Sequence, residues 1–348
     1  MLWNAATYTL FLRMIDNMNH KSNTASAPNF NLIVFGEALI DDFPNESVVG
    51  GAPFNVARSL AQLGAQPLML TRIGDDPHGS LIQNEFSRTG LSSLGLQIDQ
   101  HYPSGRVAVH MEHGADASQH RFEILATQAY DFIDTHQVLQ LVQQHFPEDA
   151  PDLIYFGSMI QRSAVSREAL FALLEADCCE GATKFLDLNL RDGQASIETI
   201  QASLNYADIV KLNEDELRFV VGHALDDAYL AEVVLDVDSL GAACQALMQQ
   251  YMMQAVIVTL GEQGYFYFDA DHQVVTSLGR TMPSMPDEWV LRDTVGAGDA
   301  FSACFIRGWQ QNQDLQTVLD RANQFARAVC GVRGAVAPDL NFYTPWRV

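Results

Sequence analysis

Two glycines and an aspartate stand together in the C-terminal part of the sequence. The segment Gly296-Ala297-Gly298-Asp299 precedes an amphipathic helix expected over 300–309. Glycines at a helix entrance leave backbone N–H groups free, and the helix dipole adds positive potential, so the segment could bind an anion. A carboxylate there would repel a bound anion. It is useful, however, if it takes a proton from a hydroxyl that then attacks a phosphoryl group, whose charge the N–H groups stabilise.

The same segment also has a simpler interpretation. An aspartate in the first turn of a helix is common and can serve as a cap without any catalytic role. Two other glycine motifs are excluded. A dinucleotide-binding fingerprint would need a third glycine where Phe301 stands, and no Gly-x₄-Gly-Lys-Ser/Thr segment of a P-loop enzyme occurs.

Strands and helices alternate along most of the chain. Short apolar runs ending near glycine indicate buried strands, and the amphipathic segments between them indicate helices. This alternation predicts an α/β fold with a parallel sheet covered on both faces. The expected strands span 32–35, 68–71, 153–156, 184–188, 208–212 and 255–260, and the expected helices span 53–63, 77–89, 166–176, 214–221, 239–252, 300–309 and 315–332.

Two stretches break this alternation. Residues 105–124 alternate polar and apolar side chains, with Val107, Val109 and Met111 on one side, which predicts antiparallel strands of a small, half-exposed sheet. Residues 43–49 are short and turn-like. A small sheet inserted into an α/β core is a natural lid over a site at the carboxyl ends of the strands, where open α/β sheets bind ligands.

The composition limits the classes of partner. The chain has 348 residues and a formal net charge of −23, which makes nucleic acid and anionic membranes poor partners. No apolar run approaches the ~18 residues needed to span a bilayer. The five cysteines are odd in number and show no metal-ligand spacing, so we expect free thiols in a reducing cytoplasm.

The first 29 residues differ from the rest. They are rich in Asn, Thr, Ser and Met, and their apolar piece 8–12 is short and is followed, not preceded, by an arginine. That pattern is a poor signal peptide. We therefore expect residues 1–29 to be a disordered extension and residues 30–348 to form one folded domain.

Two separated motifs resemble those of one enzyme family. The segment 293–301, Asp-Thr-Val-Gly-Ala-Gly-Asp-Ala-Phe, resembles the C-terminal signature of the ribokinase family of carbohydrate kinases, also called the PfkB family. Segments 50–57, 60–64 and 72–79 resemble its first motif in order and spacing. The resemblance covers residues 32–337. It implies a three-layer α/β/α ribokinase-like core, a lid from about 38–50 and 103–126, and an ATP-dependent sugar kinase.

The resemblance also implies roles for individual residues. Asp299 would be the catalytic base, with Gly296, Ala297 and Gly298 forming the anion site. Asp41 matches the family aspartate that holds sugar hydroxyls, although a loop or N-cap aspartate is the simpler alternative. The remaining sugar contacts would be Gly50, Gly51, Asn55 and the lid residue Arg106, which is nearly as well explained as a solvated arginine.

The resemblance places the nucleotide on the other side of the site. The segments that match the family's ATP-binding loop and helix contain Asn213, Thr259, Gly261, Gly264 and Asn323.

Two metal sites are implied by the same likeness. Glu216, in an Asn-x-x-Glu motif, would organise Mg²⁺ through water, although the bare motif is a common capping box. Backbone carbonyls around Asp293, Val295 and Gly334 could hold a monovalent cation such as K⁺.

The choice of substrate rests on shorter segments. Segments 36–41, 129–131, 157–158 and 187–191 look more like bacterial fructokinases than ribokinase, which favours D-fructose and its 6-hydroxyl. A 2-keto-3-deoxygluconate kinase, with Arg106 or Arg191 holding the substrate carboxylate, and a ribokinase-type activity are the alternatives. A catalytically silent homologue that only binds or regulates is the alternative of a different class.

Some stretches depart from the family pattern. Residues 226–239 form an acidic, apolar insertion, and 282–288 lengthen the approach to the Asp299 loop. These departures affect the adenine site and any oligomer interface. The lid is the surface through which we expect a homodimer to form.

Overall fold

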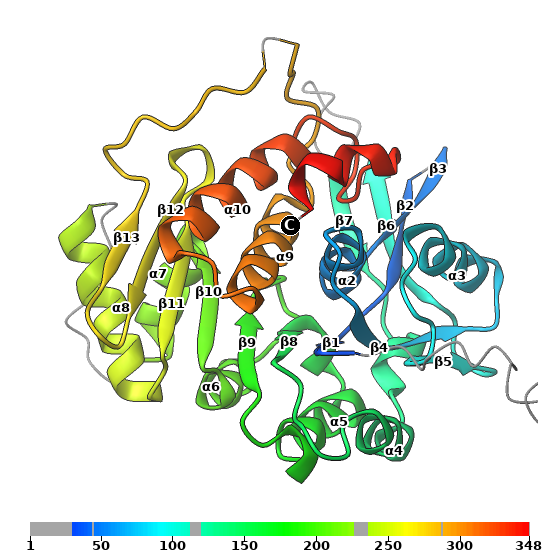
Figure 1. Cartoon of the computed structure of the whole chain (residues 1–348). Coiled ribbons are helices and arrows are strands. Elements are labelled where there is room, and N and C mark those ends of the chain that lie inside the picture. Colours follow the sequence, from blue (N-terminus) through cyan, green and yellow to red (C-terminus); the bar gives the residue numbers. More distant parts are fainter. Residues whose placement is uncertain (1–29, 44, 112–119, 226–235, 287, 348) are drawn as a thin grey trace, which may run out of the picture.

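The main sheet is mostly parallel and contains nine strands. The structure, a computed structural model, describes residues 30–43, 45–111, 120–225, 236–286 and 288–347. The strand order is β13-β12-β11-β10-β9-β8-β1-β4-β5, and only β12 and β13, at one edge, run antiparallel to their neighbours (Figure 1). The strands are β1 (Leu32–Phe35), β4 (Pro67–Gly74), β5 (Leu96–Asp99), β8 (Leu153–Gly157), β9 (Thr183–Asp187), β10 (Ile209–Asn213), β11 (Ala255–Thr259), β12 (Tyr265–Asp269) and β13 (Val274–Thr276).

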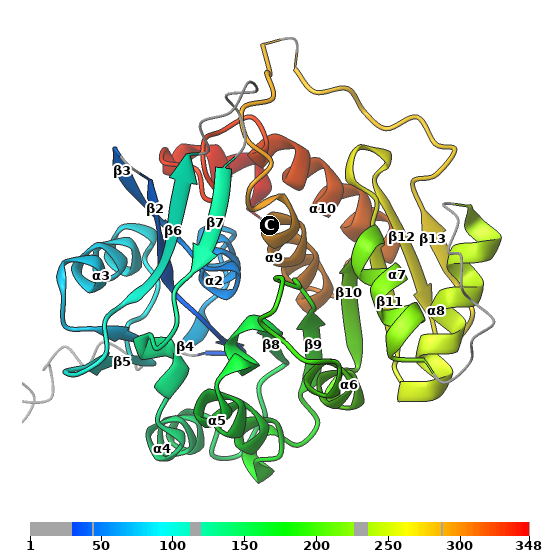
Figure 2. The same ribbon diagram turned by 180° about the vertical axis from the view of Figure 1, so that it is seen from behind.

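Helices cover both faces of this sheet, as Figures 1 and 2 show from opposite sides. Alternate residues of β1 enter two separate cores: Leu32 and Val34 pack with α2, α3, α9 and α10, whereas Ile33 and Phe35 pack with α4 to α8. A strand buried on both faces must be apolar throughout, as β1 is. The helices are α2 (Ala52–Gln62), α3 (Pro77–Thr89), α4 (Thr135–His145), α5 (Ala164–Leu174), α6 (Ile197–Tyr206), α7 (Glu214–His223), α8 (Val237–Tyr251), α9 (Ala297–Gln310) and α10 (Leu315–Val329).

A second, four-stranded sheet forms the lid. Its order is β3-β2-β6-β7, with β2 (Leu39–Phe43), β3 (Glu46–Gly50), β6 (Gly105–Met111) and β7 (His120–Ile124). The chain enters it directly from the end of β1 and returns through Gly50 and Gly51 into α2. The lid is thereby tied to the carboxyl end of β1, an interior strand of the main sheet.

The three-layer fold and the lid are confirmed, and each expected strand and helix lies within a few residues of its expected place. Some details differ. Strand β3 occupies most of the stretch 43–49, for which the sequence predicts a turn, and β2 pairs with β6 in parallel. Strands β5, β12 and β13 have no counterpart among the expected strands, and helices α4 and α6 have none among the expected helices. The extension 1–29 and most of the insertion 226–239 lie outside the described residues.

Two simpler expectations can also be compared with the structure. All five cysteines are free. Across the described ranges, no helix combines the length and the apolar character that a bilayer crossing requires.

Candidate active site

Asp299 lies in the first turn of α9, where an amide group of α2 holds its carboxylate. Asn55 Nδ2 donates a hydrogen bond of 2.8 Å to Asp299 Oδ2, across 244 residues of sequence. The helices α2 and α9 pack on the same face of the sheet. The sequence predicts both residues as parts of the site, and the structure brings them into direct contact.

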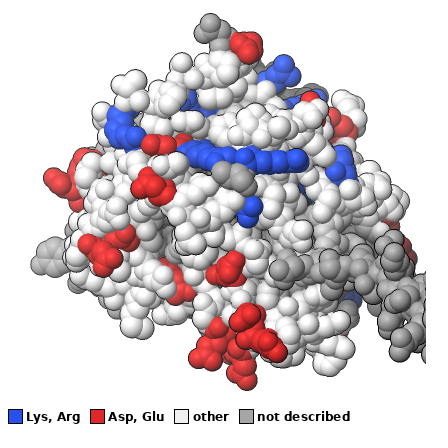
Figure 3. Space-filling model, viewed as in Figure 1, with Lys and Arg blue, Asp and Glu red and all other residues white. Residues whose placement is uncertain are grey.

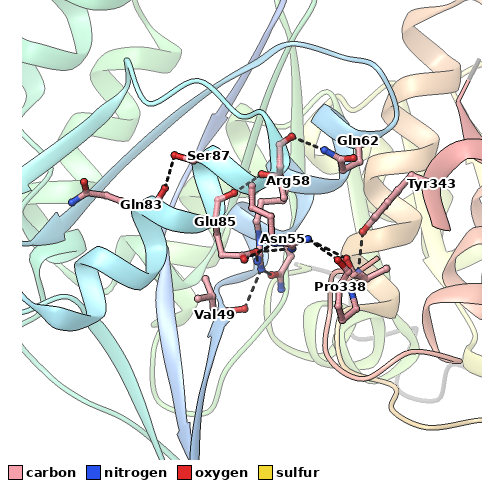
Figure 4. A network of polar contacts seen from close by, with 12 residues as sticks. Val49, Asn55, Arg58, Gln62, Gln83, Glu85, Ser87, Pro338 and Tyr343 are labelled. Atoms are coloured by element: carbon pink, nitrogen blue, oxygen red, sulfur yellow. Dashed lines mark hydrogen bonds and ion pairs between the residues drawn. The ribbon is translucent and has the colours of Figure 1, made fainter. Parts of the chain in front are cut away.

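The orientation of Asn55 is itself fixed by a chain of buried polar contacts (Figure 4). Arg58 Nη2 donates to Asn55 Oδ1 at 2.6 Å and to the Val49 carbonyl oxygen at 3.1 Å. Arg58 Nη1 forms an ion pair with Glu85 Oε2 at 2.6 Å. Because Arg58 occupies the amide oxygen, the amide nitrogen of Asn55 is the end that faces Asp299.

The turn before Asp299 has the geometry expected of an anion site. Gly296 adopts φ 78°, in the left-handed region, and a Cβ there would lie 2.3 Å from Ala335 Cβ, so only glycine fits. The turn carries no side-chain cap. The amides of Gly298 and Asp299 are therefore first-turn N–H groups that an α-helix leaves without an intrahelical partner.

A buried ion pair lies against this turn, and no motif in the sequence points to it. Asp187, at the end of β9, accepts hydrogen bonds from Lys211 Nζ at 2.8 and 2.9 Å, from Ser302 Oγ at 2.7 Å and from Tyr155 Oη at 3.1 Å. A Cβ placed on Gly298 would lie 3.4 Å from Lys211 Nζ. The ammonium therefore adds positive charge beside the turn.

The surroundings of Asp299 suit a proton acceptor. Burial, with a smaller contribution from the negative charge of Asp187, raises the pKa of Asp299 to about 6. The hydrogen bond from Asn55 and the positive charges of Lys211 and Arg191 act in the opposite direction. A base with a pKa just below neutrality is charged at pH 7 yet still accepts a proton readily.

Three of the predicted sugar residues, Asp41, Gly50 and Gly51, lie on the lid side. Asp41 is on lid strand β2, and burial raises its pKa to about 6, against the attraction of Arg191. A Cβ on Gly50 would lie 2.6 Å from Asp41 Oδ2, and one on Gly51 would lie 2.6 Å from the carbonyl oxygen of Glu37. The two glycines thus allow the backbone to pass close to these groups.

Arg106 is not brought together with Asp41. In the lid register Arg106 pairs with Ile40 and so lies on the other face of the sheet from Asp41. Its guanidinium forms an ion pair of 2.7 Å with Asp42. Arg191, by contrast, acts electrostatically on Asp41, Asp299 and Glu37, which places this exposed cation at the site.

The predicted nucleotide residues fall on neighbouring strands and one helix. Asn213 and Thr259 are register partners at the ends of β10 and β11. Gly261 and Gly264 have φ of 57° and 100°, so the loop after β11 uses the left-handed region twice. A Cβ on Gly264 would lie 3.5 Å from the side-chain nitrogen of Asn323 on α10. The five residues therefore line one end of the sheet, next to α9.

Glu216 meets the requirements for holding a metal through water. Its Oε2 accepts from the Asn213 amide at 2.8 Å and its Oε1 from the Leu190 amide at 2.7 Å, so the carboxylate is rigid and caps α7. Burial raises its pKa, while Lys211 opposes that shift. Of the described residues, no three His, Cys, Asp or Glu side chains form a direct metal cluster. The donors present thus fit Mg²⁺ held by one carboxylate, water and phosphate oxygens.

The residues proposed for a monovalent cation also meet. Asp293 Oδ1 accepts from the Val295 amide at 3.0 Å, and Asp293 Oδ2 accepts from the Gly334 amide at 3.1 Å. The carboxylate therefore joins the loop before α9 to the loop after α10. Neither hydrogen bond uses a backbone carbonyl oxygen, the group expected to bind the cation.

Comparison with known proteins shows similarity to one family of carbohydrate kinases along nearly the whole chain. The model of the family described as pfkB family carbohydrate kinase matches residues 29–341. The fructokinase of Klebsiella pneumoniae is 28% identical over 337 residues, which are 92% of this chain and 97% of that protein.

Solved structures show the same fold at lower identity. The fructokinase of Vibrio cholerae O395, solved with fructose, ADP and calcium, has a TM-score of 0.69 and 22% identity and covers 91% of this chain and 98% of its own. The 2-dehydro-3-deoxygluconokinase of Thermotoga maritima has a TM-score of 0.70 and 17% identity, with the same coverage.

Proposed function

We propose that this chain, which belongs to the pfkB family of carbohydrate kinases, phosphorylates the 6-hydroxyl of D-fructose with ATP. The observation that carries the proposal is the placement of Asp299. It lies at the amino end of α9, is oriented by Asn55 and is flanked by the free amides of a glycine turn. The fructokinase relatives support fructose as the sugar.

The site residues have separate roles in sugar binding, proton transfer and charge stabilisation. Asp41 and the backbone at Gly50 and Gly51 hold sugar hydroxyls between lid and core. Asp299 takes the proton of the attacking hydroxyl, and the oxygen of that hydroxyl forms its bond to the γ-phosphorus as the bond to ADP breaks. The turn amides and the Lys211 ammonium stabilise the charge on the moving phosphoryl group.

The nucleotide and the metal belong to the opposite side of the site. Asn213, Thr259, Gly261, Gly264 and Asn323 would contact ATP, and Glu216 would hold Mg²⁺ through water. When bound, Mg²⁺ neutralises phosphate charge and orients the phosphates. The Asp293 loop is proposed to bind K⁺ through backbone carbonyls.

A second substrate is favoured by one observation. Arg191 is exposed at the site, and its guanidinium donates a long hydrogen bond of 3.4 Å to the backbone carbonyl of Leu190. Such a cation could bind the carboxylate of 2-keto-3-deoxygluconate. Asp41 would repel that carboxylate, so we rank fructose first.

The test is ADP release measured on hexoses, pentoses, 2-keto-3-deoxygluconate and nucleosides. We expect fructose to give the highest kcat/KM, and Asp299→Asn to lower kcat by about three orders of magnitude or more without loss of folding. A higher value for the keto-deoxy acid would replace fructose by the second substrate. ATP binding without turnover of any polyol would indicate a silent homologue.

A further inference from the structure

A narrow pocket, too tight for a free water molecule, lies where the winding of the main sheet reverses. After β1 the chain adds β4 and β5 on one side, whereas β8, β9 and β10 follow one another on the other side. The neighbours β1 and β8 therefore flank the topological switch point, and open α/β sheets bind ligands outside the carboxyl ends of such strands. The pocket is lined, among others, by Glu37, Tyr155, Gly157, Ser158, Asp187 and Asn189.

Two buried side-chain oxygen atoms that line this pocket have no hydrogen-bond partner among the described residues. Glu37 follows β1 and is 2% exposed, and Ser158 follows β8 and is 1% exposed. In the described part of the chain, neither Glu37 Oε2 nor Ser158 Oγ has a hydrogen-bond partner. Leaving a buried polar group unpaired is costly, and two in one pocket indicate that a partner from outside the chain completes them.

The chain does not neutralise the carboxyl of Glu37. Arg162 attracts it but is committed to Asp131, at 2.8 Å, and Arg191 attracts it from an exposed position. Burial, as the largest effect, raises the pKa of Glu37 to about 7. The negative charge of Asp299 raises the pKa of Glu37 further, so the two carboxyl groups lie close enough to interact electrostatically.

We propose that Glu37 and Ser158 form a subsite that binds one hydroxyl of the sugar other than the hydroxyl that is phosphorylated. The inference rests on the proposed sugar kinase function. A hydroxyl carries one donor and two acceptor positions, so it can donate to Glu37 Oε2 and accept from Ser158 Oγ at the same time. The reacting hydroxyl is engaged by Asp299. The subsite therefore recognises the hydroxyl at a second position of the same sugar and fixes the orientation of the sugar in the site.

The test combines two enzyme variants with a set of monodeoxy sugars. Each analogue lacks one non-reacting hydroxyl of the sugar that the wild-type enzyme turns over best. For Glu37→Gln and Ser158→Ala we expect kcat/KM for the intact sugar to fall about 10- to 100-fold, with KM for ATP unchanged. One and the same analogue should behave differently for both variants. Its kcat/KM should differ by less than about threefold between the wild type and either variant, because this analogue lacks the hydroxyl that Glu37 and Ser158 bind.

Controls separate the possible failures. Glu180→Gln is the control. Glu180 lies in the same β8–β9 connection as Ser158 but near its β9 end and is exposed, so removing its charge should leave kcat/KM unchanged for every sugar. Melting temperatures identify a variant that does not fold, and Ser158→Ala, the smaller change, then carries the test. Equal losses on all analogues would overturn the subsite alone. Absence of turnover on any sugar by the wild type would overturn the proposed function, and the subsite with it.

Discussion

At the scale of single residues, the carboxylate of Asp299, the proposed base, is held by Asn55, and Asn55 is in turn held by Arg58. Arg58 occupies the oxygen of the Asn55 amide and leaves the amide nitrogen for Asp299. Arg58 is itself anchored by Glu85 and by the backbone of Val49. Arg58 is therefore a positioning residue, and its effect should be visible in the ionisation of the base.

We predict that Arg58→Lys moves the acidic limb of the pH–rate profile to higher pH. In the wild type kcat/KM should rise with pH through about 6, since Asp299 must be deprotonated to accept a proton. The Asn55 hydrogen bond favours the charged carboxylate and lowers its pKa. Without the guanidinium of Arg58 the side-chain amide of Asn55 is free to rotate, so its hydrogen bond to Asp299 is weakened. The pKa of Asp299 should therefore rise, and kcat at pH 7 should fall by about tenfold.

Arg88→Gln is the matched control for this prediction. Arg88 also pairs with Glu85, at 2.7 Å, but its hydrogen bonds within the described chain do not reach Asn55. The change should lower stability by a similar amount and leave the acidic limb where it is. Equal shifts in the two variants, or no shift with Arg58→Lys, would contradict the positioning role.

The residues of the site differ in how far the sequence alone could predict them. Asp299 and Asn55 belong to long motifs, so their types and spacing are enough to propose them. Asp187 and Lys211 could not be given roles in that way. Their contacts join separate strands and helices, across as many as 115 residues, and only the parallel order of the strands brings them together.

At the scale of elements, the amino end of α9 depends on how the loop after α10 packs against it. Gly296 stands at a positive φ, and Ala335 fills the space where a Cβ would be, with its own Cα at 2.5 Å. Neither atom is the end of a flexible side chain. The entrance of α9 is thus fixed by backbone contact, not by a cap.

We predict that Gly296→Ala lowers both stability and turnover. The added methyl group cannot be accommodated without moving Ala335 or the turn, at a cost of about 1–3 kcal/mol. The displaced turn amides should reduce kcat more than KM, since they act on the charge that develops during transfer. Chemical denaturation and steady-state kinetics measure the two effects.

Gly222→Ala offers a control glycine in another helix. It lies in α7, and, apart from its chain neighbours and the backbone of its own helix, no atom of the described chain lies within 4 Å of the added Cβ. There the change should be neutral or stabilising by up to about 1 kcal/mol, with normal activity. A stable, active Gly296→Ala enzyme would show that the turn is not constrained as described.

Most elements could be predicted because their patterns are local. Helix α3 begins after Asp76 with a proline in its first turn and ends at Gly90 in the left-handed region, and it has the bounds that the sequence predicts. The edge strands β12 and β13 are not expected from the sequence: β13 has only three residues, and the antiparallel direction of the pair depends on pairing and not on composition. Strand β3 resembles a turn in sequence because it is short and polar at its start.

At the scale of the whole molecule, charge is distributed unevenly. The chain carries a net charge of −23, yet on the face shown in Figure 3 the basic side chains gather in the upper half. In the same orientation Figure 1 shows the carboxyl ends of β9 and β10 pointing upward. On this face, the visible cations therefore lie toward the end of the sheet where we propose that the nucleotide binds. A homodimer formed through the lid stays a prediction.

The division into lid and core places the two ends of the proposed sugar site on different parts of the fold. Asp41 belongs to lid strand β2, whereas Asp299 and Asn55 belong to helices on the main sheet. A sugar bound between them would bridge the two parts and resist their separation. Local opening of the lid should therefore become less frequent when sugar is bound.

We predict that saturating sugar slows amide hydrogen exchange in β2 and β6 and not in β13, at the far edge of the main sheet. Asp41→Asn should raise KM for the sugar by about tenfold or more, because a hydrogen bond to a charged acceptor is lost. It should also weaken the protection of β2 and β6 at the sugar concentration that saturates the wild type. Protection that is equal in β13 and the lid, or unchanged in the variant, would mean that the sugar does not join the lid to the core through Asp41.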